Sequence, residues 1–538
     1  MKILFVSYCG ANGNSLPHMA GFARELIRLE GVESVAIALP GKVLEAERAR
    51  EILADQGLEA AAARGRLRLV SQLEALQGIA AGETYDILHL WTPREITRRW
   101  LQAAALAWPA PERPWPAVII HLEDNEESLC ERKFGSHHAW EVAAGDRSKP
   151  LSSAFSHPRH YRDLLSLAEG ATVIWETLAE FVPLTTPAME LLPGVDLANF
   201  TPRPPDVAMC RSLGITPFTW WELASFTPVP GQSAEQGREL VVCYNGNTTF
   251  ANHGDMVALY TALQTLRREG WPIRLIRTGQ DNVELLEHLG FETASWVSTL
   301  GFVPRGDLPA IYSLAHLFIQ PGPPDEFNNY RLPSKLPEYL ASGGVCVLPA
   351  ANIGQRLRDG AEALLLQTGD AAEIAARVRF FLTDPNLYEL MGQRARRFAQ
   401  EKFDPQRQAT MLAGFYRQCL AGIRKSGPKR GGAVLATPGL AYLAGIGREI
   451  STPYTDPERE LAASRAANSM LASRLREAQD HELPALRAEV RQLKEDLRQS
   501  AKLASTQGVT LGEITGSKAW RTFGKPLFKL EKKARKEK

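Results

Sequence analysis

Apolar and polar positions alternate in blocks along the first part of the chain. Apolar runs of strand length are separated by amphipathic stretches, and a glycine-bearing loop and an amphipathic stretch follow the first run. Buried strands that alternate with helices predict a doubly wound parallel sheet in an α/β domain. The apolar runs lie at residues 2–8, 35–38, 67–70, 86–90 and 117–122.

A second series of the same kind begins at residue 239. Residues 201–238, between the two series, are rich in Pro, Trp and Ser and are expected to connect two domains. A chain of 538 residues is also too long for a single hydrophobic core. In the second series, strand-length runs lie at 239–244, 274–278 and 345–348, and amphipathic stretches at 256–269, 371–382, 386–402 and 403–420, where Met411, Leu412, Phe415 and Tyr416 form the apolar side.

The C-terminal part follows neither series. Residues 457–506 are rich in Ala, Glu, Arg and Leu, with apolar residues at alternating spacings of three and four at 483–497. This spacing is a short heptad seam, which predicts either self-association into a homo-oligomer or a helical hairpin packed on the body. The predicted organisation is domains at 1–200 and 239–403, the connection 201–238, a crossover helix 404–425, a linker 426–456, a helical segment 457–506 and a tail 507–538.

Charge is balanced over the chain and concentrated only at its end. The formal charge is 62 − 61 = +1, so no nucleic-acid partner is expected from the body. Residues 518–538 hold nine Lys or Arg against two Glu, and aromatic and Leu residues lie between the basic ones. An amphipathic anchor on an anionic membrane surface fits this tail, as do a disordered basic tail and an RNA contact.

Cysteine usage and hydropathy indicate the compartment. The six cysteines are scattered and form no CxxC pair or zinc spacing, so a reducing cytosol and no structural metal are expected. The first apolar run is too short for a signal peptide, and no apolar run reaches transmembrane length. The sequence predicts a cytoplasmic protein, peripheral on the inner face of the plasma membrane if the tail is an anchor.

The stretch 322–349 carries the clearest chemical signal. Ser334 as N-cap and Gly343 as stop predict a short helix between them, followed by a buried strand. Arg331 and Lys335 add positive charge at the start of this helix, which suits a phosphate. Glu338, one turn further on, suits a vicinal diol such as ribose. Taken alone, Lys335 and Glu338 also fit a solvated i, i+3 surface pair.

Other candidates lie in loops and at strand ends. Gly13, after the first strand, and Gly246, after the first strand of the second series, permit close approach of backbone to a ligand, although ordinary turns fit them equally. His121 is at the carboxyl end of its strand, where it either contacts a ligand or is satisfied by a neighbouring carboxylate. Residues 125–160 show little periodicity and are assigned to acceptor binding.

Three segments resemble the retaining GT-B glycosyltransferases of family four, the glycosyl transferases group 1. They are RLPSKLPEYLASGG, LLPGVDLANFTP and GFVPRGDLPAIYSLAHLFIQPG, and the resemblance covers about residues 1–425. It implies two Rossmann-like domains that face a cleft, a nucleotide-diphosphate sugar as donor substrate, and no cofactor or metal. It also implies that Glu338 holds the ribose, that Val303 lies at the base, that Gly13 lies near the diphosphate and that His121 contacts the hexose.

Three positions depart from the family pattern. Tyr330 stands where many members carry a second glutamate that faces the donor sugar, and Asn247 and His253 stand where members carry an Arg and a Lys that grip the diphosphate. Arg331 and Lys335 are expected to supply part of this charge. His253 adds charge if it is protonated.

The resemblance implies transfer of a sugar, with retention, to a glycan or lipid-linked acceptor in cell-surface polysaccharide biosynthesis. Catalytic roles fall to His121, Arg331 and Lys335, and binding roles to Gly13, Gly246, Asn247, His253, Val303, Tyr330 and Glu338. Two other functions fit the same fold: a nucleotide-sugar epimerase, and a catalytically degenerate body that serves as a coiled-coil scaffold at a membrane.

Overall fold

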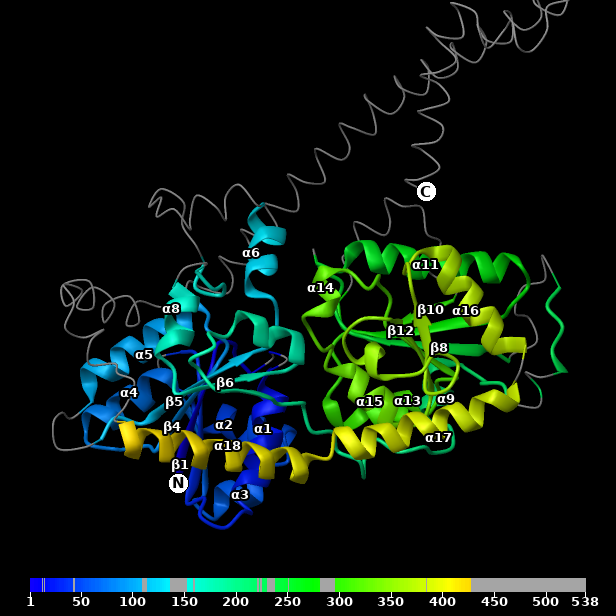
Figure 1. Cartoon of the computed structure of the whole chain (residues 1–538). Coiled ribbons are helices and arrows are strands. Elements are labelled where there is room, and N and C mark those ends of the chain that lie inside the picture. The colour runs from blue at the N-terminus through cyan, green and yellow to red at the C-terminus, as the bar shows by residue number, and fades with distance from the viewer. Residues whose placement is uncertain are drawn as a thin grey trace, which may run out of the picture. The chain divides into compact units, whose positions relative to one another are not determined.

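The computed structural model describes residues 1–426 apart from 12, 14, 42–43, 109–113, 136–151, 158–159, 220–221, 223–224, 230–237, 250, 281–295 and 384. Residues 427–538, with nearly all of the predicted linker and the whole predicted helical segment and basic tail, lie outside the described residues, as do half of the predicted acceptor loop 125–160 and most of the end of the domain connection. Two parallel sheets organise the described part, with helices on both faces of each (Figure 1).

The first sheet has seven strands in the order β3-β2-β1-β4-β5-β6-β7, and every neighbouring pair is parallel. Its central strands are buried along nearly their whole length, as the apolar runs predicted. The strands are β1 (Lys2–Ser7), β2 (Ser34–Leu39), β3 (Leu67–Ser71), β4 (Ile87–Trp91), β5 (Ala117–Leu122), β6 (Gly170–Val173) and β7 (Ala188–Glu190).

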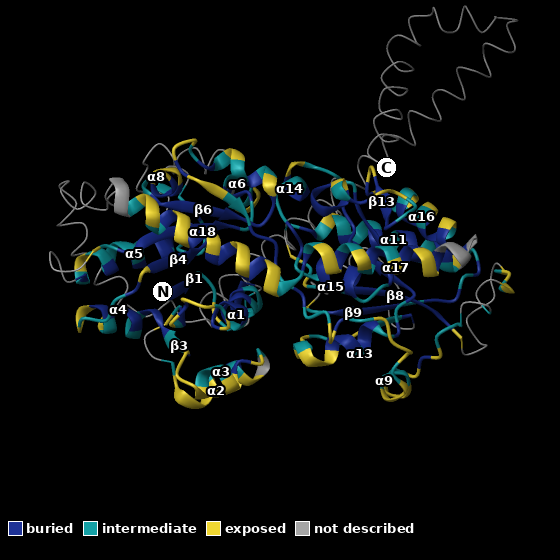
Figure 2. Cartoon of the chain, turned by 60° about the horizontal axis from the view of Figure 1, so that its bottom comes forward, coloured by how far each residue is buried: buried dark blue, intermediate teal, exposed yellow. Residues whose placement is uncertain are grey.

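Helices cover both faces of this sheet, with exposed residues on their outer sides (Figure 2). Helix α4 begins with a capping box, in which Ser71 and Glu74 bond each other's backbone amides. The helices are α1 (Ser15–Leu26), α2 (Ala46–Asp55), α3 (Glu59–Ala63), α4 (Gln72–Ala80), α5 (Glu95–Ala107), α6 (Glu126–Phe134), α8 (His160–Leu167) and the 3₁₀ helix η1 (Glu176–Phe181); α9 (Val207–Leu213) follows in the domain connection.

The second sheet has six parallel strands in the order β10-β9-β8-β11-β12-β13. Its strands are β8 (Leu240–Asn245), β9 (Ile273–Thr278), β10 (Val297–Thr299), β11 (Leu317–Ile319), β12 (Val345–Pro349) and β13 (Leu364–Leu366). Its helices are α11 (His253–Arg268), η2 (Arg305–Asp307), α13 (Leu308–Tyr312), α14 (Glu326–Asn329), α15 (Lys335–Ala341), η3 (Asn352–Arg356), α16 (Ala371–Thr383) and α17 (Pro385–Lys402). The predicted class, two Rossmann-like α/β domains, is confirmed.

Helix α18 (Pro405–Ser426) follows α17 and packs on the first domain (Figure 1). The Tyr416 hydroxyl is 2.6 Å from Nδ1 of His89, and both side chains are buried. A Cβ on Gly170 would lie 2.7 Å from the Phe415 ring, so β6 and α18 approach closely. The prediction for Met411 was wrong, because it is 42% exposed and lies outside the apolar stripe of the helix.

Strand order determines where each domain can bind a ligand. The order reverses between β1 and β4 in the first sheet and between β8 and β11 in the second. In doubly wound sheets, ligands bind outside the carboxyl ends of strands at such a reversal. The loops after β1, β4, β8 and β11 are therefore the places to look for a site.

Candidate functional site

Helix α15 starts with Lys335 and ends before Gly343, which has a φ of +71°, and the buried strand β12 follows. The predicted order of helix, glycine stop and strand is thus observed. Ser334 holds the predicted N-cap position, but its side chain makes no capping hydrogen bond. Ser334 has helical φ and ψ values in place of the extended values typical of a cap, so its side chain does not satisfy the first amides of the helix.

Lys335 and Gly246 come together at the carboxyl end of β8. The Lys335 Nζ lies 4.1 Å from the centre of the Tyr244 ring, and a Cβ on Gly246 would lie only 2.9 Å from this Nζ. Gly246 has a φ of +145°, which other residues rarely adopt. Burial, together with the charges of Arg331 and Arg277, holds the pKa of Lys335 well below its ordinary value. An anion beside Nζ would favour its charged form.

Arg331 lies where residues of the two domains meet. Its guanidinium is 4.4 Å from the centre of the Phe327 ring, and that of Arg132, from α6 of the first domain, is 4.3 Å from the same ring. Arg132 also pairs with Asp325 at 3.1 Å. The Nε of Arg331 is buried and has no hydrogen-bond partner in the described part of the chain. Arg331 thus retains donor capacity for an anion.

The Glu338 carboxylate is buried and held from two sides. Its Oε1 pairs with Arg305 Nη2 at 2.6 Å, and its Oε2 accepts a hydrogen bond from the Tyr312 hydroxyl at 3.1 Å. Neither partner was predicted. The alternative of a solvated Lys335–Glu338 surface pair is wrong, because Glu338 is only 4% exposed and its ion-pair partner is Arg305. Each carboxylate oxygen retains a second lone pair that could accept from a diol.

Val303 lies in the loop that leads to this ion pair. It is half-buried and packs against the core, whereas its neighbour Phe302 is 74% exposed. Arg305 follows two residues later in η2. The loop predicted to lie at the base is therefore joined to the carboxylate predicted to hold the ribose.

Asn247 and His253, the two positions at which the sequence lacks the expected Arg and Lys, belong to the loop after β8 and the start of α11. Asn247 Oδ1 accepts a hydrogen bond from the Gln280 amide at 2.8 Å, and its carbonyl accepts one from Asn252 Nδ2 at 2.9 Å. His253 begins α11 on the far side of the same loop. These contacts orient the Asn247 side chain toward the loop after β9.

A buried arginine that the sequence analysis overlooked supplies charge behind this loop. Arg277, near the end of β9, is 0% exposed and donates from Nη2 to the Gly246 carbonyl at 3.0 Å and from Nη1 to the Thr248 hydroxyl at 3.2 Å. In the register of the sheet it lies beside Tyr244. Arg277, near the carboxyl end of the strand IRLIRT, was the signal that could have revealed it.

Tyr330 contacts the first domain. Its hydroxyl donates to Oε1 of Glu180, and its ring lies 5.4 Å from that of Phe181. The hydrogen bond to the Glu180 carboxylate raises the pKa of Tyr330 to about 12. Tyr330 is thus bonded to η1 in this structure.

In the first domain, His121 is a buried residue near the carboxyl end of β5. Its Nδ1 is 2.8 Å from the Thr172 hydroxyl, and its ring lies 4.3 Å from that of Trp91. Burial lowers the pKa of His121 to about 4, so it is neutral at pH 7. The alternative in which a neighbouring carboxylate satisfies His121 is not observed among the described residues, since its hydrogen-bond partner is the Thr172 hydroxyl, and the side chain is only 1% exposed.

Glu123, two residues after His121, contacts the end of β4 and the start of α1, which follows the loop after β1. It accepts hydrogen bonds from Trp91 Nε1 at 2.7 Å and from the Ser15 hydroxyl at 2.5 Å, and lies 3.5 Å from His18 Nδ1. Burial raises the pKa of Glu123, but the hydrogen bond and charge of His18 and the charge of His121 outweigh it and bring the pKa to about 2.

Gly13 lies in the loop after β1. A Cβ on Gly13 would lie 2.2 Å from the Cys9 sulfur, so the loop folds back closely on Cys9. The Gly13 amide donates to the Gly10 carbonyl at 3.0 Å. Its amide therefore serves the turn in this structure.

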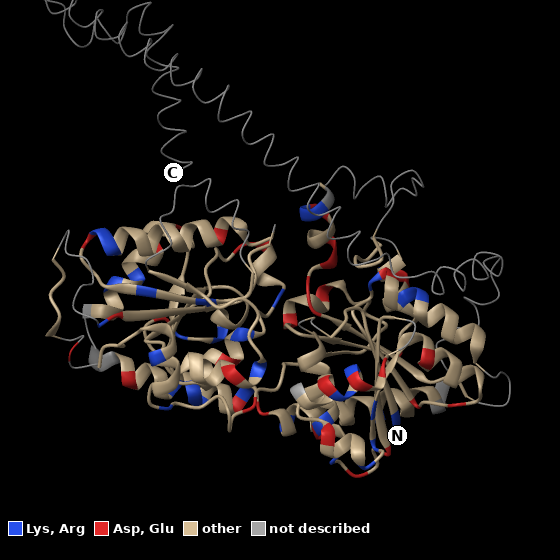
Figure 3. Cartoon of the chain, turned by 180° about the vertical axis from the view of Figure 1, so that it is seen from behind, with Lys and Arg blue, Asp and Glu red and all other residues tan. Residues whose placement is uncertain are grey.

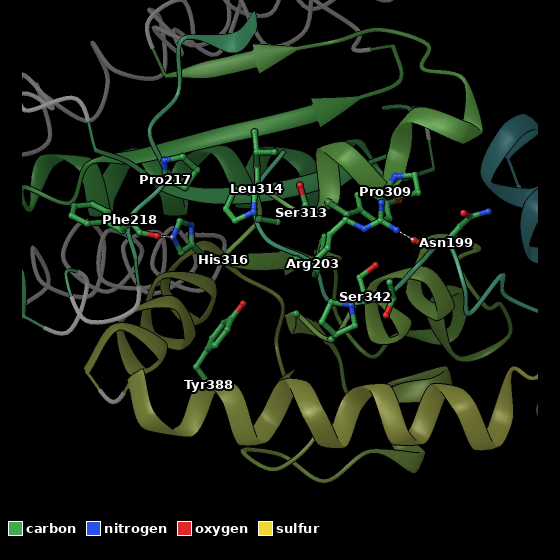
Figure 4. Close-up of a pocket in the computed structure, with 18 residues that line it drawn as sticks. Asn199, Arg203, Pro217, Phe218, Pro309, Ser313, Leu314, His316, Ser342 and Tyr388 are labelled. Atoms are coloured by element: carbon green, nitrogen blue, oxygen red, sulfur yellow. Dashed lines mark hydrogen bonds between the residues drawn. The ribbon is translucent and has the colours of Figure 1, made fainter. Parts of the chain in front are cut away.

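A cavity of about 200 Å³ lies elsewhere in the second domain (Figure 4). Leu314 and His316 line it just before β11, and Ser342 and Gly344 just before β12. It therefore opens at the amino ends of these strands, opposite to the edge that carries Lys335 and Gly246. None of the predicted site residues lines it.

Lys and Arg residues and Asp and Glu residues occur along the ribbons of both domains (Figure 3). Among the described residues, no group of three or more His, Cys, Asp or Glu side chains is placed to hold a metal ion. Within the same residues, no helix combines the length and apolarity needed to cross a bilayer.

Comparison with solved structures identifies the class of fold. Anabaena Alr3699/HepE in complex with UDP and glucose matches with a TM-score of 0.53 at 14% sequence identity. Sucrose-phosphate synthase from Thermosynechococcus elongatus matches with a TM-score of 0.51 at 14% sequence identity. Each match covers 78% of this chain and 100% of the other chain. The catalytic domain of starch synthase IV from Arabidopsis thaliana, bound to ADP and acarbose, matches with 0.50 at 11% identity over 78% of this chain and 99% of that one. The fold is that of the GT-B glycosyltransferases.

The family match falls on the second domain. Residues 239–384 match the model of the glycosyl transferases group 1, and this stretch contains Gly246, Lys335 and Glu338. No curated protein matches the chain. The group 1 domain and the shared fold together support a glycosyltransferase.

Proposed function

We propose that the protein transfers a sugar from a nucleotide-diphosphate donor to a glycan or lipid-linked acceptor, with retention of the anomeric configuration. The single observation that carries the proposal is the cluster at the end of β8, in which Lys335 lies against Gly246 and Arg277 supports the same loop from behind. Fixed cations at a leaving diphosphate stabilise the charge that develops in the transition state.

The donor is seated by three parts of the second domain. Lys335 and Arg331 bind the diphosphate, with Gly246 allowing close approach, and His253 and Asn247 border the same loop. Glu338, oriented by Arg305 and Tyr312, accepts the ribose hydroxyls. The loop around Val303 contacts the base.

The acceptor is bound by the first domain. Beside the acceptor, His121 orients the donor hexose through Nε2, since its Nδ1 faces the Thr172 hydroxyl. Gly13 lies in the loop near the diphosphate, and Tyr330 borders the donor sugar. A role in cell-surface polysaccharide assembly follows from the resemblance stated above, and so does retention.

A donor panel tests the proposal. Incubation with nucleotide sugars that differ in base and sugar should release nucleoside diphosphate from one of them, and addition of acceptor should accelerate the release. Glu338→Gln should lower the rate by about 10²–10³. Glu401→Gln, at an exposed position of α17, is the matched control and should change nothing.

The second candidate is a protein that keeps the glycosyltransferase fold but has lost catalytic activity and serves as a scaffold. The hydrogen bond from Tyr330 to Glu180 favours it, because Tyr330 stands where a carboxylate that faces the sugar would be expected. It predicts binding of nucleotide without release across the whole panel. Interconversion of donor sugars without release would indicate an epimerase instead.

A further inference from the structure

Asn245 ends β8 and directly precedes Gly246. Its side chain is bonded at both of its polar atoms. The Nδ2 donates to the Tyr312 hydroxyl at 2.7 Å, and the Oδ1 accepts a hydrogen bond from the Thr278 hydroxyl. The backbone amide of Asn245 donates to the Tyr339 hydroxyl at 2.6 Å. Hydrogen bonds to α13, β9 and α15 therefore fix the residue from which the loop after β8 starts.

The bond between Asn245 and Tyr312 continues to Glu338. The Tyr312 hydroxyl accepts from Asn245 and donates to Oε2 of Glu338 at 3.1 Å. Tyr312 is 3% exposed and Glu338 is 4% exposed, so water hardly competes for the bond between them. Hydrogen bonds in such a buried chain strengthen one another. The carboxylate assigned to the ribose is thus joined, through one tyrosine, to the residue before the glycine assigned to the diphosphate.

Helix α15 reaches the same strand end at two other points. The Lys335 Nζ lies 4.1 Å from the centre of the Tyr244 ring, and the Tyr339 hydroxyl holds the Asn245 amide. The proposed ribose and diphosphate subsites are therefore built on one helix and one strand end. A shift of Asn245 would move both Gly246 and the Tyr312 hydroxyl that holds Glu338.

We propose that Asn245 and Tyr312 are positioning residues that couple the ribose subsite to the diphosphate subsite. Ribose bound at Glu338 fixes Asn245 through Tyr312, and with it the Gly246 loop that receives the diphosphate. Coupling of this kind is reciprocal, so a bound diphosphate also improves the hold on the ribose. The proposal rests on the donor site proposed above and adds how its two halves act together.

Inorganic pyrophosphate tests the coupling, because it has neither ribose nor base and reports the diphosphate subsite alone. In calorimetric titration, Tyr312→Phe should bind pyrophosphate about three- to tenfold more weakly than wild type, the range expected for the loss of one hydrogen bond. Thr278→Val keeps the shape of its side chain and removes the other bond to the Asn245 side chain, so its affinity should fall by a similar factor.

Tyr388→Phe is the matched control. It removes the hydroxyl of another buried tyrosine, which lines the cavity at the opposite edge of the same sheet. Its affinity for pyrophosphate should be that of the wild type. Thermal unfolding of each variant separates the two roles of Tyr312, since a purely structural role lowers the unfolding temperature and leaves the pyrophosphate affinity unchanged.

UDP and ADP provide a second readout. Tyr312→Phe should weaken whichever nucleotide the wild type binds by at least as much as it weakens pyrophosphate, because the hold on the ribose is affected as well. Wild-type affinity for pyrophosphate in both Tyr312→Phe and Thr278→Val would overturn the coupling and leave the donor site in place. A wild type that binds none of pyrophosphate, UDP and ADP would remove the donor site, and the coupling with it.

Discussion

Arg305 Nη2 lies 2.6 Å from Oε1 of Glu338, 33 residues along the chain, and orients a carboxylate that is 4% exposed. Removal of Arg305 leaves this carboxylate with the Tyr312 hydroxyl as its remaining partner. Because an unpaired buried charge is costly, Arg305→Met should lower the free energy of unfolding by about 1–3 kcal/mol. We expect the loss of stability to be in the lower part of this range, because Arg305 is partly exposed and solvent screens its interaction with Glu338.

Denaturant unfolding of the double variant Arg305→Met/Glu338→Gln checks the cause. The neutral Gln no longer needs a cation, so the double variant should be more stable than the sum of the two single changes predicts. Strictly additive changes would show that the pair is not coupled.

Gly246→Ala should disturb the proposed donor site. The new Cβ would lie 2.9 Å from Lys335 Nζ, and the φ of +145° is strained for alanine. We expect a loss of about 1–3 kcal/mol in stability and weaker donor binding. Gly414→Ala, on the exposed side of α18 with no atom within 4 Å, should instead stabilise by about 0.5–1 kcal/mol. Equal effects at the two sites would contradict this account.

Stability should decline in mild acid because His89, His121 and His316 are buried, and burial lowers the pKa of each. Burial lowers the pKa of His121 and of His316 to about 4, below the unfolded value of about 6.5. The unfolded state therefore binds protons first as pH falls, and stability is lost between about pH 6.5 and 4, by up to about 3 kcal/mol for each histidine.

Urea unfolding at pH 7, 6, 5 and 4 measures this loss. His121→Gln should make the decline shallower in this window. Glu123, with a pKa of about 2, should contribute only below pH 4.5, so it does not account for the same decline. A stability that is constant from pH 7 to 5 would contradict burial of neutral histidines.

Tyr330→Phe separates two roles of this residue. The Tyr330–Glu180 bond lies at the surface, so its loss should lower the free energy of unfolding by less than about 1 kcal/mol. If Tyr330 also binds the sugar, the Michaelis constant for the donor should rise while thermal stability hardly changes. An unchanged Michaelis constant would restrict Tyr330 to contact with η1.

Much of the fold could be predicted from local pattern. Continuous apolar runs such as 345–348 identify strands buried on both faces, and Gly343 marks the end of α15. Ser334 was predicted at the N-cap position that it holds, but the sequence could not show that its helical φ and ψ would leave the capping hydrogen bond unmade. Met411 was assigned to the buried side of α18 because periodicity alone does not give the width of the apolar stripe.

The site could be predicted only where its residues are close in sequence. Arg331, Lys335 and Glu338 lie within one short segment and were found together. Arg277 reaches Gly246 through strand pairing, and Arg305 reaches Glu338 through packing of α15 against the loop after β10. Contacts of this kind depend on tertiary structure, which spacing along a single sequence does not encode.

The most direct test of the donor site is calorimetric titration of Lys335→Met with the nucleotide sugar that the wild type binds. Met retains the packing of the side chain on Tyr244 and removes a poorly solvated charge, so thermal stability should be unchanged or higher. Donor affinity should fall at least tenfold, by about 1.4 kcal/mol or more. Undiminished affinity in a folded Lys335→Met protein would contradict the claim that this lysine binds the donor diphosphate.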